Sequence, residues 1–330
     1  MREPSFWWQR PGPAATLLAP LAAGYGAIAA RALTRTGARA GIPVICVGNL
    51  TVGGAGKTPA ALAIAALLLA AGKHPFFLTR GYGGALKGPV RVDPVTHRAA
   101  DVGDEPLLLA RVAPTVVARN RVAGAAAARA DGADVIVMDD GFQNPSLVKD
   151  FSLIVIDGRR GIGNARVIPA GPLRAPLMEQ LDHADAVLVV GDGDGAAAAI
   201  ARTRALPLFH GRLVPELNAV AALLGHKVLA FAGIGDPQKF FGTLDAAAID
   251  APVRLPFADH HRYSPLEAAN ILDRAARDRL IPLTTEKDFA RMATDPALAA
   301  LASRTRVLPV TLMVIEEDAL RKLVLAKAGG

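Results

Sequence analysis

Short, continuous apolar runs alternate with longer helix-forming stretches along the first two-thirds of the chain. Their length and apolar character predict buried strands, at residues 42–47, 74–79, 115–118, 135–138, 152–156 and 186–190. Alanine-rich stretches such as 57–71 and 121–130 predict helices between several of them. Buried strands that alternate with helices indicate a parallel sheet covered on both faces. Right-handed crossovers then gather the loops that follow the strands along one edge, where ligands bind.

A second group of elements begins near Pro207. The predicted strands cover 208–214, 228–232, 252–256, 281–284 and 306–313, and helices are predicted from Pro237, from Pro265 and over 316–327. We therefore expect a smaller C-terminal α/β domain over residues 206–330, which includes linker strands near 207–214 and 306–313.

Residues 1–35 differ from the rest of the chain. Trp7 and Trp8 lie beside arginines, and an uncharged stretch follows over 11–30. This stretch is close to the minimum length of a membrane span, but its many alanines and glycines and Pro20 argue against a spanning helix. Tryptophans favour the headgroup level and arginines reach anionic lipid, so we expect a helical segment on a membrane surface. The alternative is an ordinary helix packed on the domain, with the tryptophans in its core.

Composition and charge narrow the classes of protein that fit. Of 330 residues, 52% are hydrophobic and 20% are charged, which excludes wholesale disorder. The single cysteine, Cys46, excludes a disulfide framework within the chain. A formal charge of +7 suggests an anionic partner such as a nucleotide, a nucleic acid or an acidic membrane surface. Because the basic residues are scattered, we expect no nucleic-acid partner.

The sharpest motif is Thr-Val-Gly-Gly-Ala-Gly-Lys-Thr at 51–58, between the first strand and the helix that follows it. Such a loop turns backbone N–H groups toward phosphates, and its glycines allow the backbone to curl. Lys57 would reach the β- and γ-phosphates and Thr58 would ligate Mg²⁺, although Thr51 stands where the usual first glycine lies. The residues expected to bind ATP are Thr51, Val52, Gly53, Gly54, Ala55, Gly56, Lys57 and Thr58.

An acidic pair, Asp139 and Asp140, follows the strand at 135–138. A carboxylate at the end of a strand supplies the magnesium-side acid of phosphate-loop sites, and the alternative is a helix cap or a loop carboxylate. Together with the phosphate loop, the pair predicts an α/β fold of the P-loop NTPase type over residues 36–205. Its sheet is expected to be mostly parallel with helices on both faces, and the smaller α/β domain follows it.

Three further polar motifs are weak when each is taken alone. Asp104 and Glu105 precede a helix, where acidic residues act as N-terminal caps. His260 and His261 are adjacent and point in different directions, so at most one of them can serve a site. The turn at 169–174 ends in an arginine, which could clamp phosphates at a nucleotide edge or could be a solvated surface charge.

The polar motifs occur in a distinctive order along nearly the whole chain. They are 48–59 (Gly-Asn-Leu-Thr-Val-Gly-Gly-Ala-Gly-Lys-Thr-Pro), 80–83 (Arg-Gly-Tyr-Gly), 103–106 (Gly-Asp-Glu-Pro), 139–143 (Asp-Asp-Gly-Phe-Gln), 169–174 (Pro-Ala-Gly-Pro-Leu-Arg), 259–261 (Asp-His-His) and 285–288 (Thr-Glu-Lys-Asp). This set resembles the tetraacyldisaccharide 4′-kinase family of the lipid A pathway. The resemblance implies transfer of the ATP γ-phosphate to the 4′-hydroxyl of a lipid substrate, a tetraacylated glucosamine disaccharide 1-phosphate. It also implies a peripheral or monotopic enzyme on the cytoplasmic face of the bacterial inner membrane, and no obligate protein partner.

The resemblance assigns roles to individual residues. Asp104 matches the catalytic aspartate, and Glu105 its neighbour on the magnesium side. His260, the first histidine after Asp259, matches the residue that pairs with that aspartate, and Arg174 matches an arginine at the edge of the active site. The implied catalytic residues are Asp104, His260, Lys57 and Arg174, and the implied magnesium ligands are Thr58, Glu105, Asp139 and Asp140. Because His260 belongs to the second domain, we expect activity to require closure of the two domains.

Two positions depart from the family pattern. Asn144 replaces the histidine expected after Asp-Gly-Phe-Gln, and Ala175 replaces the usual glutamate after Arg174. The role of the charged turn at 285–288 stays open between structure and function. Two other classes also fit a phosphate loop: an ATPase or ligase that acts on a soluble metabolite, and a nucleotide switch recruited to membranes. The N-terminal segment argues against the first class, and the second needs no catalytic base.

Overall fold

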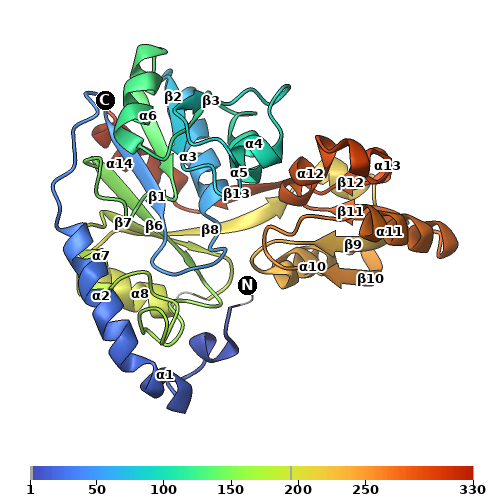
Figure 1. Ribbon diagram of the computed structural model, residues 1–330, viewed down its shortest axis with the longest axis horizontal. Helices are drawn as coiled ribbons and strands as arrows, with labels where there is room; N and C mark the ends of the chain where they lie inside the picture. Colours follow the sequence, from blue (N-terminus) through green and yellow to red (C-terminus); the bar gives the residue numbers. More distant parts are fainter. Residues whose placement is uncertain (1–2, 194, 330) are drawn as a thin grey trace.

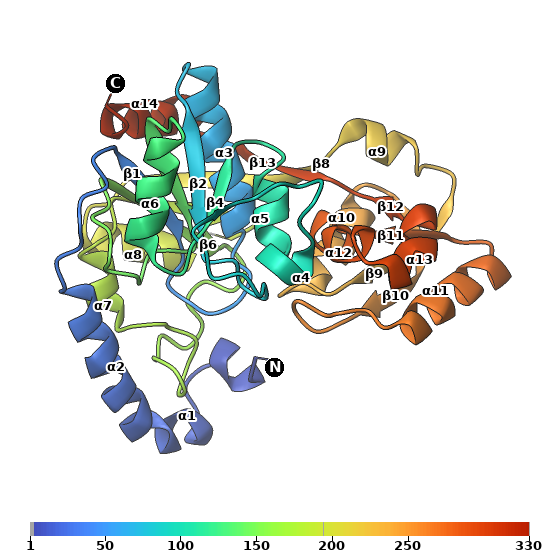
Figure 2. The same cartoon turned by 45° about the horizontal axis from the view of Figure 1, so that its top comes forward.

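The computed structural model describes residues 3–193 and 195–329, which fold into two α/β units that lie side by side (Figures 1 and 2). Within these ranges the larger unit contains a nine-stranded sheet and the smaller unit a four-stranded sheet. Two strands of the larger sheet, β8 (Leu208–Pro215) and β13 (Val310–Val314), carry the chain into the smaller unit and back again.

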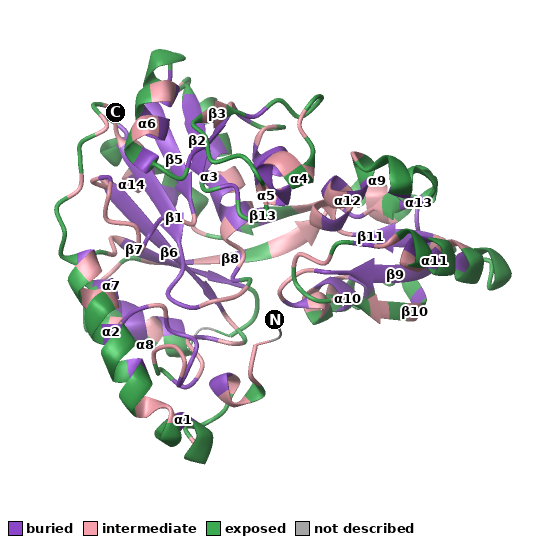
Figure 3. Cartoon of the chain, in the orientation of Figure 1, coloured by how far each residue is buried: buried purple, intermediate pink, exposed green. Residues whose placement is uncertain are grey.

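The larger sheet is mostly parallel, as predicted. In sheet order its described strands are β13, β8, β7 (Ala186–Val190), β6 (Phe151–Asp157), β1 (Val44–Gly48), β5 (Val135–Asp139), β2 (Pro75–Thr79), β4 (Thr115–Val117) and β3 (Val90–Arg91). All neighbours from β8 to β4 run parallel. The edge strands β13 and β3 run antiparallel to their neighbours β8 and β4. The central strands are buried along their whole length, which explains their continuous apolar sequences (Figure 3).

Helices cover both faces of this sheet. On β1, Val44 and Cys46 face one side while Ile45 and Val47 face the other, because successive side chains of a strand point to opposite faces. One face is covered by α3 (Lys57–Ala70), α5 (Asp104–Leu109) and α14 (Glu317–Lys327), and the other by α6 (Arg121–Ala130), α7 (Leu177–Leu181) and α8 (Gly195–Thr203). The short α4 (Ala99–Val102) directly precedes α5.

The smaller unit is also an α/β structure with a parallel sheet. Its described strands, in sheet order, are β10 (Asp250–Pro256), β9 (Lys227–Ala232), β11 (Ile281–Thr284) and β12 (Arg306–Val307). Its helical segments are α9 (Leu217–Ala221), α10 (Pro237–Ala246), α11 (Pro265–Arg277), α12 (Glu286–Ala293), η2 (Pro296–Leu298) and α13 (Ala299–Arg304). Helices on both sides of β9 bury separate apolar clusters, so this unit has a core of its own.

The strand predicted over 306–313 is wrong as a single element. Residues 306–307 form β12 in the smaller sheet, whereas 310–314 form β13 at the edge of the larger one. Pro309 lies between them and lacks the N–H that a continuous ladder needs, so the chain changes sheets at this point. The closing helix α14 packs on α3 and therefore covers the larger sheet.

The N-terminal residues form η1 (Ser5–Trp8), α1 (Pro13–Leu17) and α2 (Ala19–Leu33). In the part of the chain that the structure describes, no helix combines the length and apolar character needed to cross a bilayer. The expected placement of the tryptophans at a headgroup level is wrong for Trp7, which is buried and donates from Nε1 to the Pro169 carbonyl at 2.9 Å. The Nε1 of Trp8 donates to Glu3 Oε2 at 3.0 Å. Both indoles are thus held by protein partners.

Candidate active site

The phosphate loop connects β1 to α3 at the carboxyl ends of the parallel strands of the larger sheet. Gly53 and Gly56 have φ angles of 94° and 93°, in the left-handed region where a side chain would be strained. Lys57 starts α3, and its Nζ donates to the Gly53 carbonyl at 3.4 Å. The Lys57 ammonium therefore folds back over its own loop, where bound phosphates would lie.

The acidic pair stands directly beside this loop. Asp139 ends β5, the strand paired with β1, and its Oδ2 accepts a hydrogen bond from Thr58 Oγ1 at 3.3 Å. Among the described residues its other oxygen, Oδ1, is buried without a hydrogen-bond partner. Burial, aided by the nearby carboxylates of Glu105 and Asp140, raises the pKa of Asp139 to about 7. A cation that bound here would relieve this unpaired buried oxygen.

Asp140 is neutralised by cations. Its backbone has a φ of 53°, a left-handed conformation uncommon for a non-glycine residue. Its two oxygens lie 2.8 and 3.3 Å from Nη1 and Nη2 of Arg174, a bidentate pair, and Lys57 Nζ is 3.7 Å from Oδ2. Burial alone would raise the pKa of Asp140, but Lys57 and Arg174 outweigh it and lower that pKa. Arg174 also donates from Nε to the Thr51 carbonyl at 2.9 Å, which ties the acidic pair to the loop.

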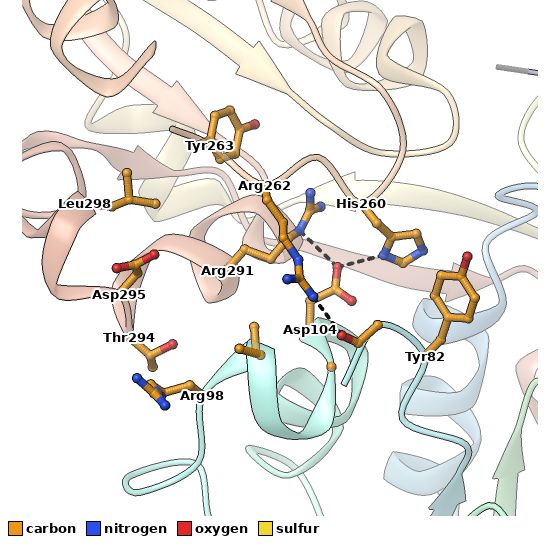
Figure 4. Close-up of a pocket in the computed structure, with 14 residues that line it drawn as sticks. Tyr82, Arg98, Asp104, His260, Arg262, Tyr263, Arg291, Thr294, Asp295 and Leu298 are labelled. Atoms are coloured by element: carbon orange, nitrogen blue, oxygen red, sulfur yellow. Dashed lines mark hydrogen bonds and ion pairs between the residues drawn. The ribbon is translucent and has the colours of Figure 1, made fainter. Parts of the chain in front are cut away.

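Asp104 lies at the start of α5 in the larger unit and is 4% exposed. Two groups of the smaller unit contact its Oδ2 (Figure 4): His260 Nδ1 at 3.2 Å and Arg291 Nε at 3.0 Å. Burial favours the neutral acid, but His260, Arg291 and Lys287 together hold the pKa of Asp104 well below its usual range. In turn, the hydrogen bond to Asp104 raises the pKa of His260. Asp104 is therefore an ionised carboxylate at neutral pH.

The adjacent histidines do point apart. His260, with a left-handed φ of 53°, reaches Asp104, whereas His261 stacks on Phe257 at a centroid distance of 4.7 Å. His261 Nε2 lies 3.1 Å from Glu267 Oε1, within the smaller unit. The structure thus brings the first histidine of the pair to Asp104.

Helix α12 contributes two cations to the same region. Lys287 Nζ donates to Glu105 Oε1 at 2.6 Å, and the carboxylates of Glu105 and Asp104 raise the pKa of Lys287 in spite of its burial. Arg291 follows four residues later, so both side chains leave α12 on one face. The other end of the 285–288 motif is structural: Thr285 Oγ1 caps the helix by accepting from the Asp288 N–H at 3.2 Å.

One cavity of about 440 Å³ collects most of these groups from both units. It is lined by residues 52–58, Glu105, Asp139, Asp140, Arg174, His260 and Lys287, among others. A second hollow of about 200 Å³ adjoins it and contains Asp104, Arg291 and again His260 (Figure 4). Of the predicted site residues, only Thr51 lines neither, and it contributes its carbonyl to Arg174 instead.

Comparison with known proteins shows which family the chain belongs to. A model of the family described as tetraacyldisaccharide-1-P 4′-kinase matches residues 14–329. The chain belongs to this family. It is 54% identical over 327 residues to the tetraacyldisaccharide 4′-kinase of Nitrobacter winogradskyi, covering 98% of this chain and 97% of that one. It is also 54% identical to the enzyme of Rhodopseudomonas palustris strain BisA53, with 100% and 96% coverage.

A solved structure from the same family also superposes on the chain. The crystal structure of the "apo" form of Aquifex aeolicus LpxK, in complex with ATP, matches with a TM-score of 0.73 and 26% identity. The match covers 95% of this chain and 99% of the other. The family resemblance seen in the motifs and the predicted α/β fold are therefore both confirmed.

One of the two departures of this kinase from the family pattern has a local structural role. Asn144 accepts a hydrogen bond from the Ser146 N–H on its Oδ1 at 2.9 Å, and so closes the turn after the acidic motif. Ala175 is buried and its carbonyl accepts from Gln180 Nε2 at 2.7 Å, a bond that any residue there could accept, so the structure does not explain the alanine. Neither side chain donates or accepts a proton in the cavity.

Motif reasoning missed Arg291, which lies outside the motifs that resemble the family. Lys287 belongs to the motif at 285–288, for which the sequence leaves a structural and a functional role open. The available signal was their spacing of four residues behind a Thr cap, which places both cations on one face of a short helix. Nothing in the sequence indicated that this face would meet Asp104 and Glu105 of the larger unit.

Proposed function

We propose that this chain transfers the γ-phosphate of ATP to the 4′-hydroxyl of tetraacyldisaccharide 1-phosphate, with Asp104 as the acceptor of the hydroxyl proton. One observation carries the proposal: an ionised, buried carboxylate lies beside the cavity onto which the phosphate loop opens. Phosphoryl transfer needs positioning, charge neutralisation and a partner for the attacking hydroxyl, and the cavity offers all three.

The phosphate loop and its lysine would bind the nucleotide. Backbone N–H groups at 52–58 and the start of α3 favour the phosphates of ATP. Lys57 Nζ now contacts the Gly53 carbonyl and Asp140, and it is free to exchange these partners for the more strongly charged β- and γ-phosphates. Lys287, supplied by the smaller unit, adds a second cation to the same cavity.

The residues present fit Mg²⁺. The orphaned Oδ1 of Asp139 and the hydroxyl of Thr58 are hard oxygen ligands, which this ion prefers. Asp140 and Glu105, which hold Arg174 and Lys287 here, complete the proposed ligand set. Among the described residues no three His, Cys, Asp or Glu side chains cluster to hold a metal by themselves. Magnesium usually needs only one or two carboxylates beside phosphates and water, and it would neutralise phosphate charge.

Asp104 and His260 would handle the proton. The hydroxyl oxygen forms a bond to the γ-phosphorus as the bond from that phosphorus to the bridging β-oxygen breaks, and ADP leaves with that electron pair. The hydroxyl proton goes to Asp104. A carboxylate with so low a pKa is a weak base, and His260, which contacts Oδ2, would orient this carboxylate for the proton transfer. A strong base is not required, because the transition state is loose.

The N-terminal segment is proposed to bind the membrane through α2 and α1 rather than through the tryptophans. Four apolar side chains, Leu17, Leu21, Tyr25 and Ile28, are 81%, 65%, 43% and 73% exposed. Their spacing of four, four and three residues gives one apolar stripe along the helical segment. Such a stripe suits the cytoplasmic face of the bacterial inner membrane, where a lipid acceptor would lie.

A hollow of about 350 Å³ connects this stripe with the phosphate loop. Tyr25 and Ala29 of α2 line one side of it, and Val52 and Arg174 line the other. Val52 and Arg174 also line the nucleotide cavity. An acceptor whose acyl chains stay near α2 could therefore present its sugar to the phosphate loop along this route.

The first experiment measures ATP-dependent phosphorylation of tetraacyldisaccharide 1-phosphate in mixed detergent micelles. We expect product from the wild type and from the control Asp131→Asn, an exposed carboxylate at the end of α6. We expect a loss of at least about 100-fold for Asp104→Asn, with ATP binding retained. Robust product from Asp104→Asn would remove Asp104 from its role. No product from folded, ATP-binding wild type would favour a soluble acceptor.

Membrane binding is tested separately by sedimentation with anionic phospholipid vesicles. The double variant Leu21→Asp with Ile28→Asp should remain in the supernatant, because two charges interrupt the apolar stripe. The control Val95→Asp changes a side chain that is 87% exposed in a loop of the larger unit, and it should sediment like the wild type. Equal sedimentation of all three proteins would contradict the proposal for α2.

A further inference from the structure

We infer that Arg291 is a positioning residue, which holds the Asp104 carboxylate so that one of its oxygens stays free for the acceptor hydroxyl. This inference rests on the proposed role of Asp104 as proton acceptor. Arg291 is not among the residues that line the nucleotide cavity. It would therefore act on the reaction through Asp104 and the loop that carries His260, without touching the nucleotide.

Every nitrogen of the Arg291 guanidinium has an oxygen partner. Its side chain is only 8% exposed. Nε lies 3.0 Å from Asp104 Oδ2, Nη1 donates to the His261 carbonyl at 3.0 Å, and Nη2 donates to the Gly233 carbonyl at 2.9 Å. Nη2 also lies 3.3 Å from Asp288 Oδ1. Only a planar fork with donors in several fixed directions can satisfy all four oxygens together.

These contacts divide the two Asp104 oxygens between different tasks. His260 Nδ1 and Arg291 Nε both contact Oδ2, from different elements of the smaller unit. Oδ1 has no hydrogen-bond partner among the described residues, and Figure 4 shows it turned away from both cations. Two donors that converge on one oxygen prevent the carboxylate from rotating about its Cβ–Cγ bond. Oδ1 is therefore kept available for a hydroxyl.

The same guanidinium also holds the partner of Asp104 in place. The two carbonyls that it binds, of Gly233 and His261, belong to the loops that follow β9 and β10, and His260 N–H donates to the Gly233 carbonyl at 3.1 Å. Arg291 thus fixes the loop conformation in which His260 adopts its left-handed backbone. Contact between the two units would therefore orient Asp104 and His260 together.

Charged groups from three elements lie around Asp104. They are His260 from the loop after β10, Lys287 and Arg291 from α12, and Glu105 from α5 itself. When Arg291 is replaced, His260 is the remaining contact on Oδ2 among the described residues, and a single donor no longer fixes the carboxylate. A purely structural role would lower the amount of folded protein without lowering the kcat of the folded enzyme.

The test compares Arg291→Gln, Arg291→Lys and Arg291→Ala in the full-length kinase, using ATP and tetraacyldisaccharide 1-phosphate in micelles. Arg291→Gln should lower kcat by about 100-fold and change KM for ATP less than about threefold. Arg291→Lys keeps the charge but not the planar fork of donors, so its kcat should lie between those of the wild type and Arg291→Gln. Added guanidinium should restore part of the activity of Arg291→Ala.

The control is Arg274→Gln, an exposed α11 arginine whose partner is Asp278, and it should match the wild type. Wild-type kcat in folded Arg291→Gln would overturn the inference. Equal losses of kcat in all three variants, without rescue by guanidinium, would overturn it as well. Asp104→Asn separates the two ideas: if that variant stays active, the proposed base is wrong, whereas if only the Arg291 variants behave as wild type, the positioning role alone fails.

Discussion

The two halves of this active site are built in different ways. On the nucleotide side, the phosphate loop is one contiguous segment, and Asp139 lies on the neighbouring strand in register with Val47 just before the loop. On the acceptor side, Asp104 meets His260 and Arg291, which lie 156 and 187 residues further along the chain. The nucleotide half therefore needs only the carboxyl ends of neighbouring strands in one sheet, whereas the acceptor half needs contact between the two units.

This difference separates binding from catalysis. The nucleotide half should persist whenever the larger sheet is folded, because its groups come from β1, α3 and β5. The acceptor half should exist only while the units touch, since Asp104 would otherwise be a solvated carboxylate without orientation. Variants of each half should therefore give different kinetic patterns.

Among the variants considered below, replacement of the loop lysine should lower kcat the most, because it disrupts the nucleotide half. Lys57→Ala removes the cation that lies over the loop, and we expect kcat to fall by about 100- to 1000-fold because transition-state charge is no longer stabilised. The thermal midpoint should stay close to that of the wild type, since Lys57 Nζ contacts only the Gly53 carbonyl and Asp140, and Asp140 keeps its pair with Arg174. Steady-state kinetics and thermal unfolding measure both quantities.

The matched control for this variant lies near the other end of the same helix. Lys73 donates from Nζ to the Gly329 carbonyl at 3.1 Å, on the surface of the larger unit. Lys73→Ala should retain wild-type kcat. A loss in Lys57→Ala smaller than about tenfold would show that the loop lysine contributes little to the transition state.

His260→Asn should break the acceptor half without disturbing the nucleotide half. We expect kcat to fall by about 10- to 100-fold, the usual range for an acid–base group, with the Kd for ATP unchanged. His261→Asn is the control, because that ring contacts Glu267 and Phe257 inside the smaller unit. Similar losses of kcat in both variants would mean that the smaller unit is distorted rather than that one pair is lost.

The stability of His260→Asn should also depend on pH in a different way from that of the wild type. The pKa of His260 is raised above its ordinary value of about 6.5, so its stabilisation is complete below about pH 6.5 and disappears as pH rises through the folded-state pKa. The free energy of unfolding of the wild type should therefore exceed that of His260→Asn more at mildly acidic pH than at alkaline pH. Denaturant unfolding at both pH values checks this sign, and a difference that grows toward alkaline pH would contradict it.

The same contrast explains how much could be predicted from the sequence. The loop at 51–58 and the strands around it follow from local periodicity and spacing, and the structure reproduces them closely. Arg291 could not be predicted, because its importance comes from a contact across two units rather than from a local pattern. Trp7 was placed at a membrane by its residue type, whereas the fold supplies the Pro169 carbonyl as its partner.

A contact between the two units outside the acceptor half tests whether closure itself limits catalysis. Lys239 Nζ of α10 lies 2.5 Å from Asp157 Oδ2 at the end of β6, and so links the units without entering the acceptor half. Lys239→Met keeps the side-chain length and removes this pair. We expect kcat to fall by about fivefold or less, since a partly exposed ion pair contributes about 1 kcal/mol or less. The Kd for ATP should not change.

Lys227→Met, at the exposed start of β9, is the matched control and should behave as the wild type. Both values come from steady-state kinetics and equilibrium ATP binding. Weaker ATP binding in Lys239→Met would contradict the separation of the two halves, because it would make the nucleotide side depend on contact between the units.

The smallest effect is expected for Tyr263→Phe, which marks where the acceptor half ends and the core of the smaller unit begins. The Tyr263 hydroxyl donates to Asp288 Oδ1 at 2.7 Å, and Asp288 keeps hydrogen bonds from the Gly233 N–H and from Thr285 when that hydroxyl is lost. We expect the free energy of unfolding to fall by about 1 kcal/mol, the contribution of one buried hydrogen bond. Because Arg291 keeps its contact with Asp104, kcat should change by less than about twofold. A drop in kcat of tenfold or more in the folded variant would extend the acceptor half through Asp288 to Tyr263, and the positioning of Asp104 would then depend on the core of the smaller unit.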